Sequence, residues 1–150
     1  MKHTAFLLIL ISSCSLACPK LEGKWHSSAA LTNKFNDERA IIDEKTREFR
    51  AQLIGKSTVE YRKGEVSMTM PPLNKIIIQG KTYPWDSSQM RSKYSLLGCT
   101  KNSVMIKYKA FGSSSIYKLN FESADIYWVY DGQVGGNGND HTREYFTRVK

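Results

Sequence analysis

Short stretches typical of β-strands follow one another from residue 57 to the end of the chain. They recur roughly every ten to fifteen residues, and the gaps between them contain the glycines Gly64, Gly80, Gly98, Gly112, Gly132 and Gly138. This rhythm of short strands and turn residues predicts an antiparallel sandwich or barrel. The predicted strands span residues 57–61, 66–70, 75–79, 93–97, 103–109, 115–121, 125–130 and 143–149.

A helical pattern precedes these strands. Apolar residues at intervals of four, seven, seven and four form one face, and they are Leu31, Phe35, Ile42, Phe49 and Leu53. Charged residues occupy the opposite face. Asn36 or Asp37 is suited to begin the helix and Gly55 to end it. The pattern therefore predicts one amphipathic helix, packed against the sheet or over a barrel end more often than against a membrane.

The first 17 residues have the pattern of a secretion signal. A weakly basic start leads into the apolar run Ala5–Ile11, which is much shorter than the ~20 residues that cross a bilayer. We therefore expect an exported protein with a signal peptide at 1–17 and a single domain at 18–150.

Two processing sites compete within this leader. The sequence Ile11-Ser12-Ser13-Cys14 resembles a bacterial lipobox, which would end the leader at residue 13 and place a lipid on Cys14. The small residues at 15–17 instead fit ordinary signal peptidase cleavage before Cys18. The expected location is accordingly the bacterial cell envelope, either free in the periplasm or lipid-anchored to a membrane.

Cys18 and Cys99 remain as a pair once Cys14 is lipidated or removed. In an oxidising compartment two such thiols predict a disulfide, whereas two buried free thiols are the alternative. A bridge over so long a loop would stabilise the fold by roughly 4–5 kcal/mol in the chain-entropy model. Lipidation of Cys18 itself would exclude the bridge.

The two ends of the mature chain carry a family resemblance. Leu21-Glu22-Gly23-Lys24-Trp25 near the start and Tyr145-Phe146-Thr147-Arg148 near the end resemble the calycins, the lipocalin and fatty-acid-binding β-barrels, and small bacterial exported proteins described as lipocalin-like. The resemblance implies an up-and-down barrel of about eight strands. It also implies that Gly23 bends the first strand while Trp25 plugs the closed end and Arg148 packs across it. A helix directly after the first strand is unlike typical lipocalins, whereas fatty-acid-binding proteins place two short helices there.

The charge pattern restricts the partners. Outside the leader the chain has 21 basic and 14 acidic residues, spread without a basic run of five or more. Such diffuse charge favours solubility, and together with export it argues against nucleic acid. We expect a monomer.

No catalytic or metal-binding pattern stands out. His26 and His141 are the histidines outside the leader, and Gly-x-Ser-x-Gly, His-Glu-x-x-His, P-loop and Cys-x-x-Cys motifs are absent from the sequence. Residues 135–140 match the core of a calcium-binding β-roll repeat, but one copy lacks the neighbouring turn that completes the ligand shell. We therefore expect no catalysis, no metal and no cofactor.

Aromatic residues suggest a ligand site inside the predicted barrel. Ile126, Trp128 and Tyr130 share one face of a strand whose other face is also apolar, as expected for a strand that lines a cavity or is buried on both sides. A filled core is the alternative. The candidate ligand-binding residues are Trp85, Tyr117, Phe121, Trp128 and Tyr130.

The sequence thus favours an exported lipocalin-like barrel that binds a small hydrophobic or amphipathic ligand in the cell envelope. The alternative is a protein-interaction module of the inhibitor or immunity type, which would block an envelope enzyme through Trp85 and the loop at residues 132–140.

Overall fold

The computed structural model describes residues 17–110, 112–131 and 141–150, so the predicted leader and the glycine-rich loop lie outside the described residues. Its elements are, in chain order, β1 (Gly23–Ser27), α1 (Ala29–Arg39), α2 (Glu44–Leu53), β2 (Thr58–Arg62), β3 (Glu65–Met70), β4 (Leu73–Ile78), β5 (Lys81–Trp85), β6 (Ser88–Thr100), β7 (Ser103–Ala110), β8 (Ser113–Ser123), β9 (Ile126–Tyr130) and β10 (Arg143–Arg148).

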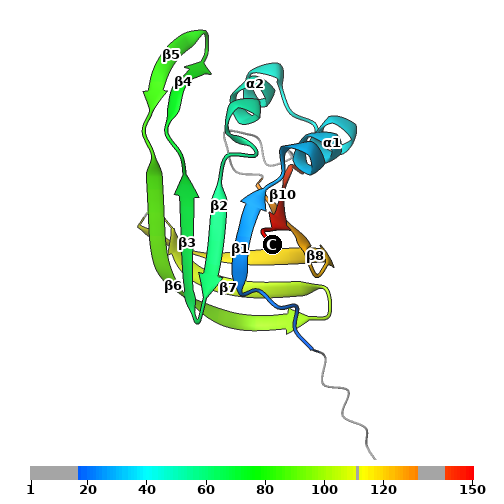
Figure 1. Ribbon diagram of the computed structural model, residues 1–150. Helices are drawn as coiled ribbons and strands as arrows, with labels where there is room; N and C mark the ends of the chain where they lie inside the picture. Colours follow the sequence, from blue (N-terminus) through cyan, green and yellow to red (C-terminus); the bar gives the residue numbers. More distant parts are fainter. Residues whose placement is uncertain (1–16, 111, 132–140) are drawn as a thin grey trace, which may run out of the picture.

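Eight of these strands close into an antiparallel barrel in the order β1-β10-β9-β8-β7-β6-β3-β2. The predicted barrel fold is confirmed. The stretch at 75–79, however, does not join the barrel, because β4 and β5 form a separate two-stranded sheet. This hairpin, which we call the arm, extends beyond β3 and β6 and rises beside α2 (Figure 1). Pro71 and Pro72 cannot donate to a ladder and separate the arm from β3.

Two helices follow β1 instead of the single helix predicted. Asp43 interrupts the pattern because its carboxylate accepts hydrogen bonds from the backbone N–H and the hydroxyl of Thr46, at 3.0 and 2.7 Å, and so begins α2. Ser28 caps α1, and the predicted caps Asn36 and Asp37 lie inside that helix. Gly55 follows α2 with φ +79°, the left-handed conformation expected of a glycine after a helix.

Helix α1 is held by side chains that complete the backbone pairing of β10. β1 ends at Ser27, opposite Phe146, so the earlier residues of β10 lack a strand partner on that side. Asn36 pairs with both backbone groups of Arg143: the N–H donates to Oδ1 at 3.0 Å, and Nδ2 donates to the carbonyl at 3.1 Å. The N–H of Tyr145 donates to the Thr32 hydroxyl at 2.9 Å. These contacts explain why two polar residues of α1 are buried.

Helix α2 contacts the arm in the same manner. The N–H of Ile77 donates to Gln52 Oε1 at 2.7 Å, and Gln52 Nε2 donates to the Ile77 carbonyl at 3.0 Å. One amide side chain on each helix therefore replaces a neighbouring strand.

The barrel is closed at the end where β1 begins. Trp25 is fully buried there, packs edge-on against Tyr127 with ring centroids 4.7 Å apart, and donates its indole N–H to the Leu21 carbonyl at 2.9 Å. The guanidinium carbon of Arg148 lies 4.1 Å from the centroid of the Trp25 ring. Gly23 has φ +129°, and a Cβ there would lie 2.7 Å from Arg148 Nη1, so both the backbone and the space require glycine.

The segment before β1 is fastened across this closed end. Arg148 donates hydrogen bonds to the carbonyls of Glu22 and Lys20, at 2.7 and 2.8 Å. The disulfide between Cys18 and Cys99 joins the same segment to β6. We call residues 18–22 the strap.

We expect Trp25→Ala to lower the free energy of unfolding by about 3–5 kcal/mol, as large aromatic truncations in cores do. Arg148→Ala should cost less, and the double variant should cost less than the sum because the two side chains are in contact. Chemical denaturation of the four proteins measures this coupling. Arg62→Ala, in an exposed ion pair, is the control that should add independently to Trp25→Ala. Additive effects of Trp25 and Arg148 would contradict a coupled plug.

Candidate functional site

The inward side chains of the barrel differ between its two ends. Near Trp25 they are buried, as at Val66, Val104 and Leu119. Toward the other end, which we call the open end, inward side chains pack against the core but are only partly buried; they are Met68, Met90, Tyr117 and Val129. Because the wall is a closed ring of strands, solvent reaches these side chains through an end of the barrel. These four side chains face the interior near the open end, and we call the region that they line the chamber.

Tyrosines gather inside the barrel between the plug and this chamber. The rings of Tyr108 and Tyr117 stack with centroids 4.3 Å apart, and Tyr127 stacks on Phe146 at 5.0 Å. Burial raises the pKa of Tyr61, Tyr108 and Tyr127, so their hydroxyls stay protonated at neutral pH. They supply neutral hydrogen-bonding groups in an otherwise apolar interior.

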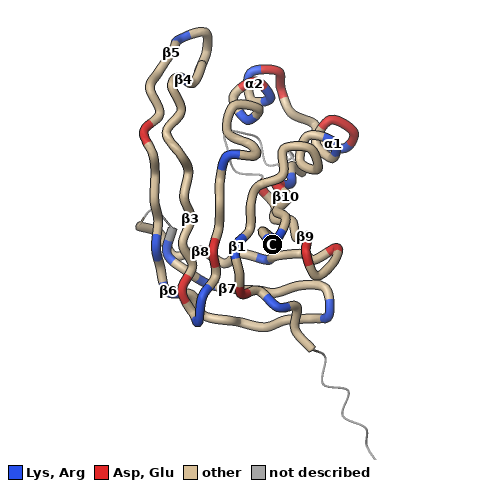
Figure 2. Tube along the Cα trace, viewed as in Figure 1, with Lys and Arg blue, Asp and Glu red and all other residues tan. Residues whose placement is uncertain are grey.

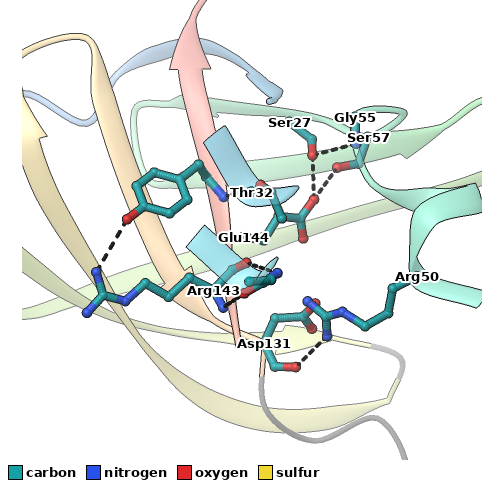
Figure 3. A network of polar contacts seen from close by, with 10 residues as sticks. Ser27, Thr32, Arg50, Gly55, Ser57, Asp131, Arg143 and Glu144 are labelled. Atoms are coloured by element: carbon teal, nitrogen blue, oxygen red, sulfur yellow. Dashed lines mark hydrogen bonds and ion pairs between the residues drawn. The ribbon is translucent and has the colours of Figure 1, made fainter. Parts of the chain in front are cut away.

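A partly buried carboxylate, Glu144, lies at the open end. Glu144 Oε1 accepts hydrogen bonds from the hydroxyls of Ser27 and Ser57, at 2.6 and 3.3 Å, and the Ser27 hydroxyl in turn accepts the N–H of Gly55 at 2.9 Å (Figure 3). The strand ends of β1 and β2 and the end of α2 thus meet at one side chain. Burial raises the pKa of Glu144, although both serine hydroxyls act against this shift.

An ion pair between a buried arginine and a partly exposed aspartate lies beside Glu144. Arg50 of α2 is 6% exposed; its Nη1 donates to the Asp131 carbonyl at 3.2 Å, and its Nη2 lies 2.9 Å from the Asp131 carboxylate. Burial raises the pKa of Asp131, and the Arg50 charge opposes that rise. Arg50 Nε has no hydrogen-bond partner among the described residues. The open end therefore combines two partly buried carboxyl groups with one buried guanidinium.

Two further recesses are present. A recess of about 200 Å³ lies between α1 and α2, with Asn33, Arg47 and Arg50 in its wall. A cleft of about 530 Å³ lies at the closed end between the strap and β6, where Leu21, Tyr94 and Leu96 line it.

The sequence-predicted ligand residues do not converge on one place. Tyr117 faces the chamber, and Phe121 is buried deeper, against Trp25 with ring centroids 5.9 Å apart. Trp85 lies at the base of the arm, where β5 pairs it with Leu73, and its indole nitrogen has no partner within the described ranges.

The expectation that Trp128 and Tyr130 face the interior is wrong. Tyr127 and Val129 point inward, and Trp128 and Tyr130 lie on the outer surface of β9. The guanidinium carbon of Arg143 sits there between Trp128 and Phe35 of α1, 3.7 and 4.1 Å from the ring centroids. Tyr130 is 60% exposed. Both faces of β9 are apolar because α1 covers part of the outer one, so alternation could not identify the inner face.

The sequence analysis did not single out Arg50, Asp131, Glu144, Met68 or Met90 as site residues. One signal was available: Glu144, Phe146 and Arg148 alternate on the last strand, so an inward Arg148 places Glu144 inside as well. Nothing comparable marks Arg50, whose position depends on how α2 packs over the barrel end.

No protein-family model, curated protein or solved structure matches this chain. Within the described part of the chain no helix is long and apolar enough to cross a membrane. The same residues contain no group of three or more His, Cys, Asp or Glu side chains placed to hold a metal ion.

The raised pKa of Glu144 makes stability depend on pH. A carboxyl group whose pKa is higher in the folded chain binds its proton more tightly when folded, so stability falls as pH rises through the unfolded and then the folded pKa. Glu144→Gln should make the free energy of unfolding depend less on pH in this range. The variant should therefore lose less stability between acid and neutral pH than the wild-type protein does. Urea denaturation across the acidic range measures the slope. The exposed Glu48→Gln should leave the slope unchanged, and an unchanged slope in Glu144→Gln would contradict the assignment.

Proposed function

We propose that this chain is an exported, lipocalin-like barrel that binds a small hydrophobic or amphipathic molecule in the chamber at its open end. The observation that carries the proposal is the set of inward side chains Met68, Met90 and Val129, which stay partly exposed at the end of the barrel away from the fully buried Trp25. Ligand sites are mostly apolar with a few fixed polar groups, and the methionines, valine and tyrosines inside the barrel supply that composition.

Membership of the calycins is part of this proposal. Gly23, Trp25 and Arg148 meet at the closed end in the manner that the resemblance implies. The two short helices between β1 and β2 favour the fatty-acid-binding branch over typical lipocalins. The disulfide and the signal-like leader support export to the cell envelope.

The walls of the chamber indicate the chemistry of the ligand. Methionine side chains adapt to irregular apolar shapes, and the tyrosine hydroxyls offer hydrogen bonds to a polar substituent. Near the open end Arg50 already pairs with Asp131, which leaves Glu144 as a carboxyl group held by neutral serines. A ligand with an apolar body and a neutral or cationic polar end fits this arrangement better than an acid does.

A ligand that binds only the folded state raises the melting temperature with concentration. We expect single-chain amphiphiles with neutral or cationic ends to do so, and Val129→Trp, which fills the chamber, to abolish the shift. Tyr130→Trp is the matched control, since it places the same residue on the outer face of the same strand. Met68→Phe offers a milder filling should Val129→Trp fail to fold. A broad panel of fatty acids, lipids and amphipathic metabolites that shifts nothing in the wild-type protein would contradict the proposal.

The arm favours the second candidate function, an interaction module. Its exposed apolar residues Ile77, Ile78 and Tyr83 project beyond the barrel. In that case the arm, and not the interior, is the binding surface. Val129→Trp and Met68→Phe, which fill the chamber, should then leave partner binding intact.

A further inference from the structure

The charge of this chain is concentrated in one half of the barrel. Residues 66–121 contain eight basic residues and a single acidic one, Asp86, whereas the remainder of the chain contains 14 basic and 13 acidic residues. The basic residues are spread along the sequence, but the acidic residues are not. Residues 66–121, which make up most of β3 to β8, therefore have a formal net charge of +7 out of the +8 of the whole chain.

The outer surface of β6, β7 and β8 displays this excess. Its exposed cationic side chains are Arg91, Lys93, Lys107, Lys109 and Lys118. Apolar side chains lie among them, with Leu97 48%, Met105 40% and Ile116 61% exposed. These eight residues are called the basic face.

The arrangement on the basic face alternates charge with apolar surface. Met105 lies opposite Lys118, and Lys107 lies opposite Ile116, so these two apolar side chains each have a lysine as cross-strand neighbour. Acidic residues are found at its borders: Glu65 opposite Lys93, and Glu122 near the end of β8. Figure 2 shows the acidic residues gathered mainly on the helices and around the closed end, with a single acidic segment between β5 and β6.

No residue of the basic face forms an ion pair with another described residue. The ion pairs among the described residues all lie elsewhere, and they join Arg47 to Asp37, Arg50 to Asp131, Arg62 to Glu60 and Arg148 to Asp125. A surface selected only for solubility mixes both signs of charge and shows apolar residues singly. On the basic face, positively charged side chains surround several apolar ones without acidic residues between them. Surfaces that bind anionic lipid have this composition.

We propose that the basic face docks on an anionic phospholipid surface. The lysines contact headgroup phosphates, and Leu97, Met105 and Ile116 enter the interfacial layer between them. A soluble polyanion would satisfy the lysines but would leave the apolar side chains in water.

Vesicle flotation tests the proposal. The chain with Cys14→Ser, which carries no lipid, is mixed with phosphatidylcholine vesicles that contain or lack phosphatidylglycerol. We expect binding to the anionic vesicles alone, and its loss at high salt because surface charges are screened. Lys107→Gln with Lys118→Gln should weaken binding by about tenfold or more, since each lysine near an anionic surface contributes about fivefold. Lys34→Gln with Lys45→Gln, exposed on the helices, makes the same change of net charge as a control.

Ile116→Ser separates a membrane from a soluble polyanion. It leaves the charge unchanged, and it should weaken binding to the anionic vesicles severalfold while leaving any binding to polyglutamate unaltered. Equal losses from both lysine pairs would overturn the proposal, because net charge alone would then explain binding. Binding to polyglutamate without binding to anionic vesicles would overturn it too. Circular dichroism of each variant checks that the barrel is intact.

Discussion

The contact between Arg148 and Trp25 joins the two ends of the chain and closes one end of the barrel. Arg148 belongs to the last strand, yet it covers the ring of a residue on the first strand and donates to two carbonyls of the strap. The plug, the strap and the seam between β1 and β10 are therefore one assembly. The glycine at position 23 is a consequence, since a side chain there would occupy the space of the guanidinium.

The contact between Trp25 and Arg148 could be predicted because the resemblance to the calycins implies it. The disulfide could be predicted because two cysteines remain after the leader. Glycine turns and short strands likewise predicted a barrel, and Gly55 marked the end of a helix. Glycines at regular intervals and a glycine after a helix mark backbone conformations that other residues rarely adopt, so these features could be predicted from the sequence.

The inner face of β9 and the break between α1 and α2 could not be predicted, because they depend on distant partners. The apolar pattern of β9 predicted that Trp128 faces the interior, whereas Arg143 and Phe35 pack over it on the outer surface. The helical pattern predicted Asp43 as a charged residue on the surface of one long helix, whereas its carboxylate caps the start of α2. The ion pair at the open end could not be predicted for the same reason, since Arg50 and Asp131 are far apart in the sequence and meet only when α2 packs over the barrel.

The amide side chains of Asn36 and Gln52 have a consequence for dynamics. Because they replace strand neighbours, the backbone N–H groups of Arg143 and Ile77 are protected by helices and not by the barrel ladder on that side. When a helix detaches, these protons become free to exchange with solvent while the ring of strands stays closed. We therefore expect the helices to open separately from the plugged end, and the hydrogen-exchange rates of these two N–H groups to depend on how long each helix stays in place.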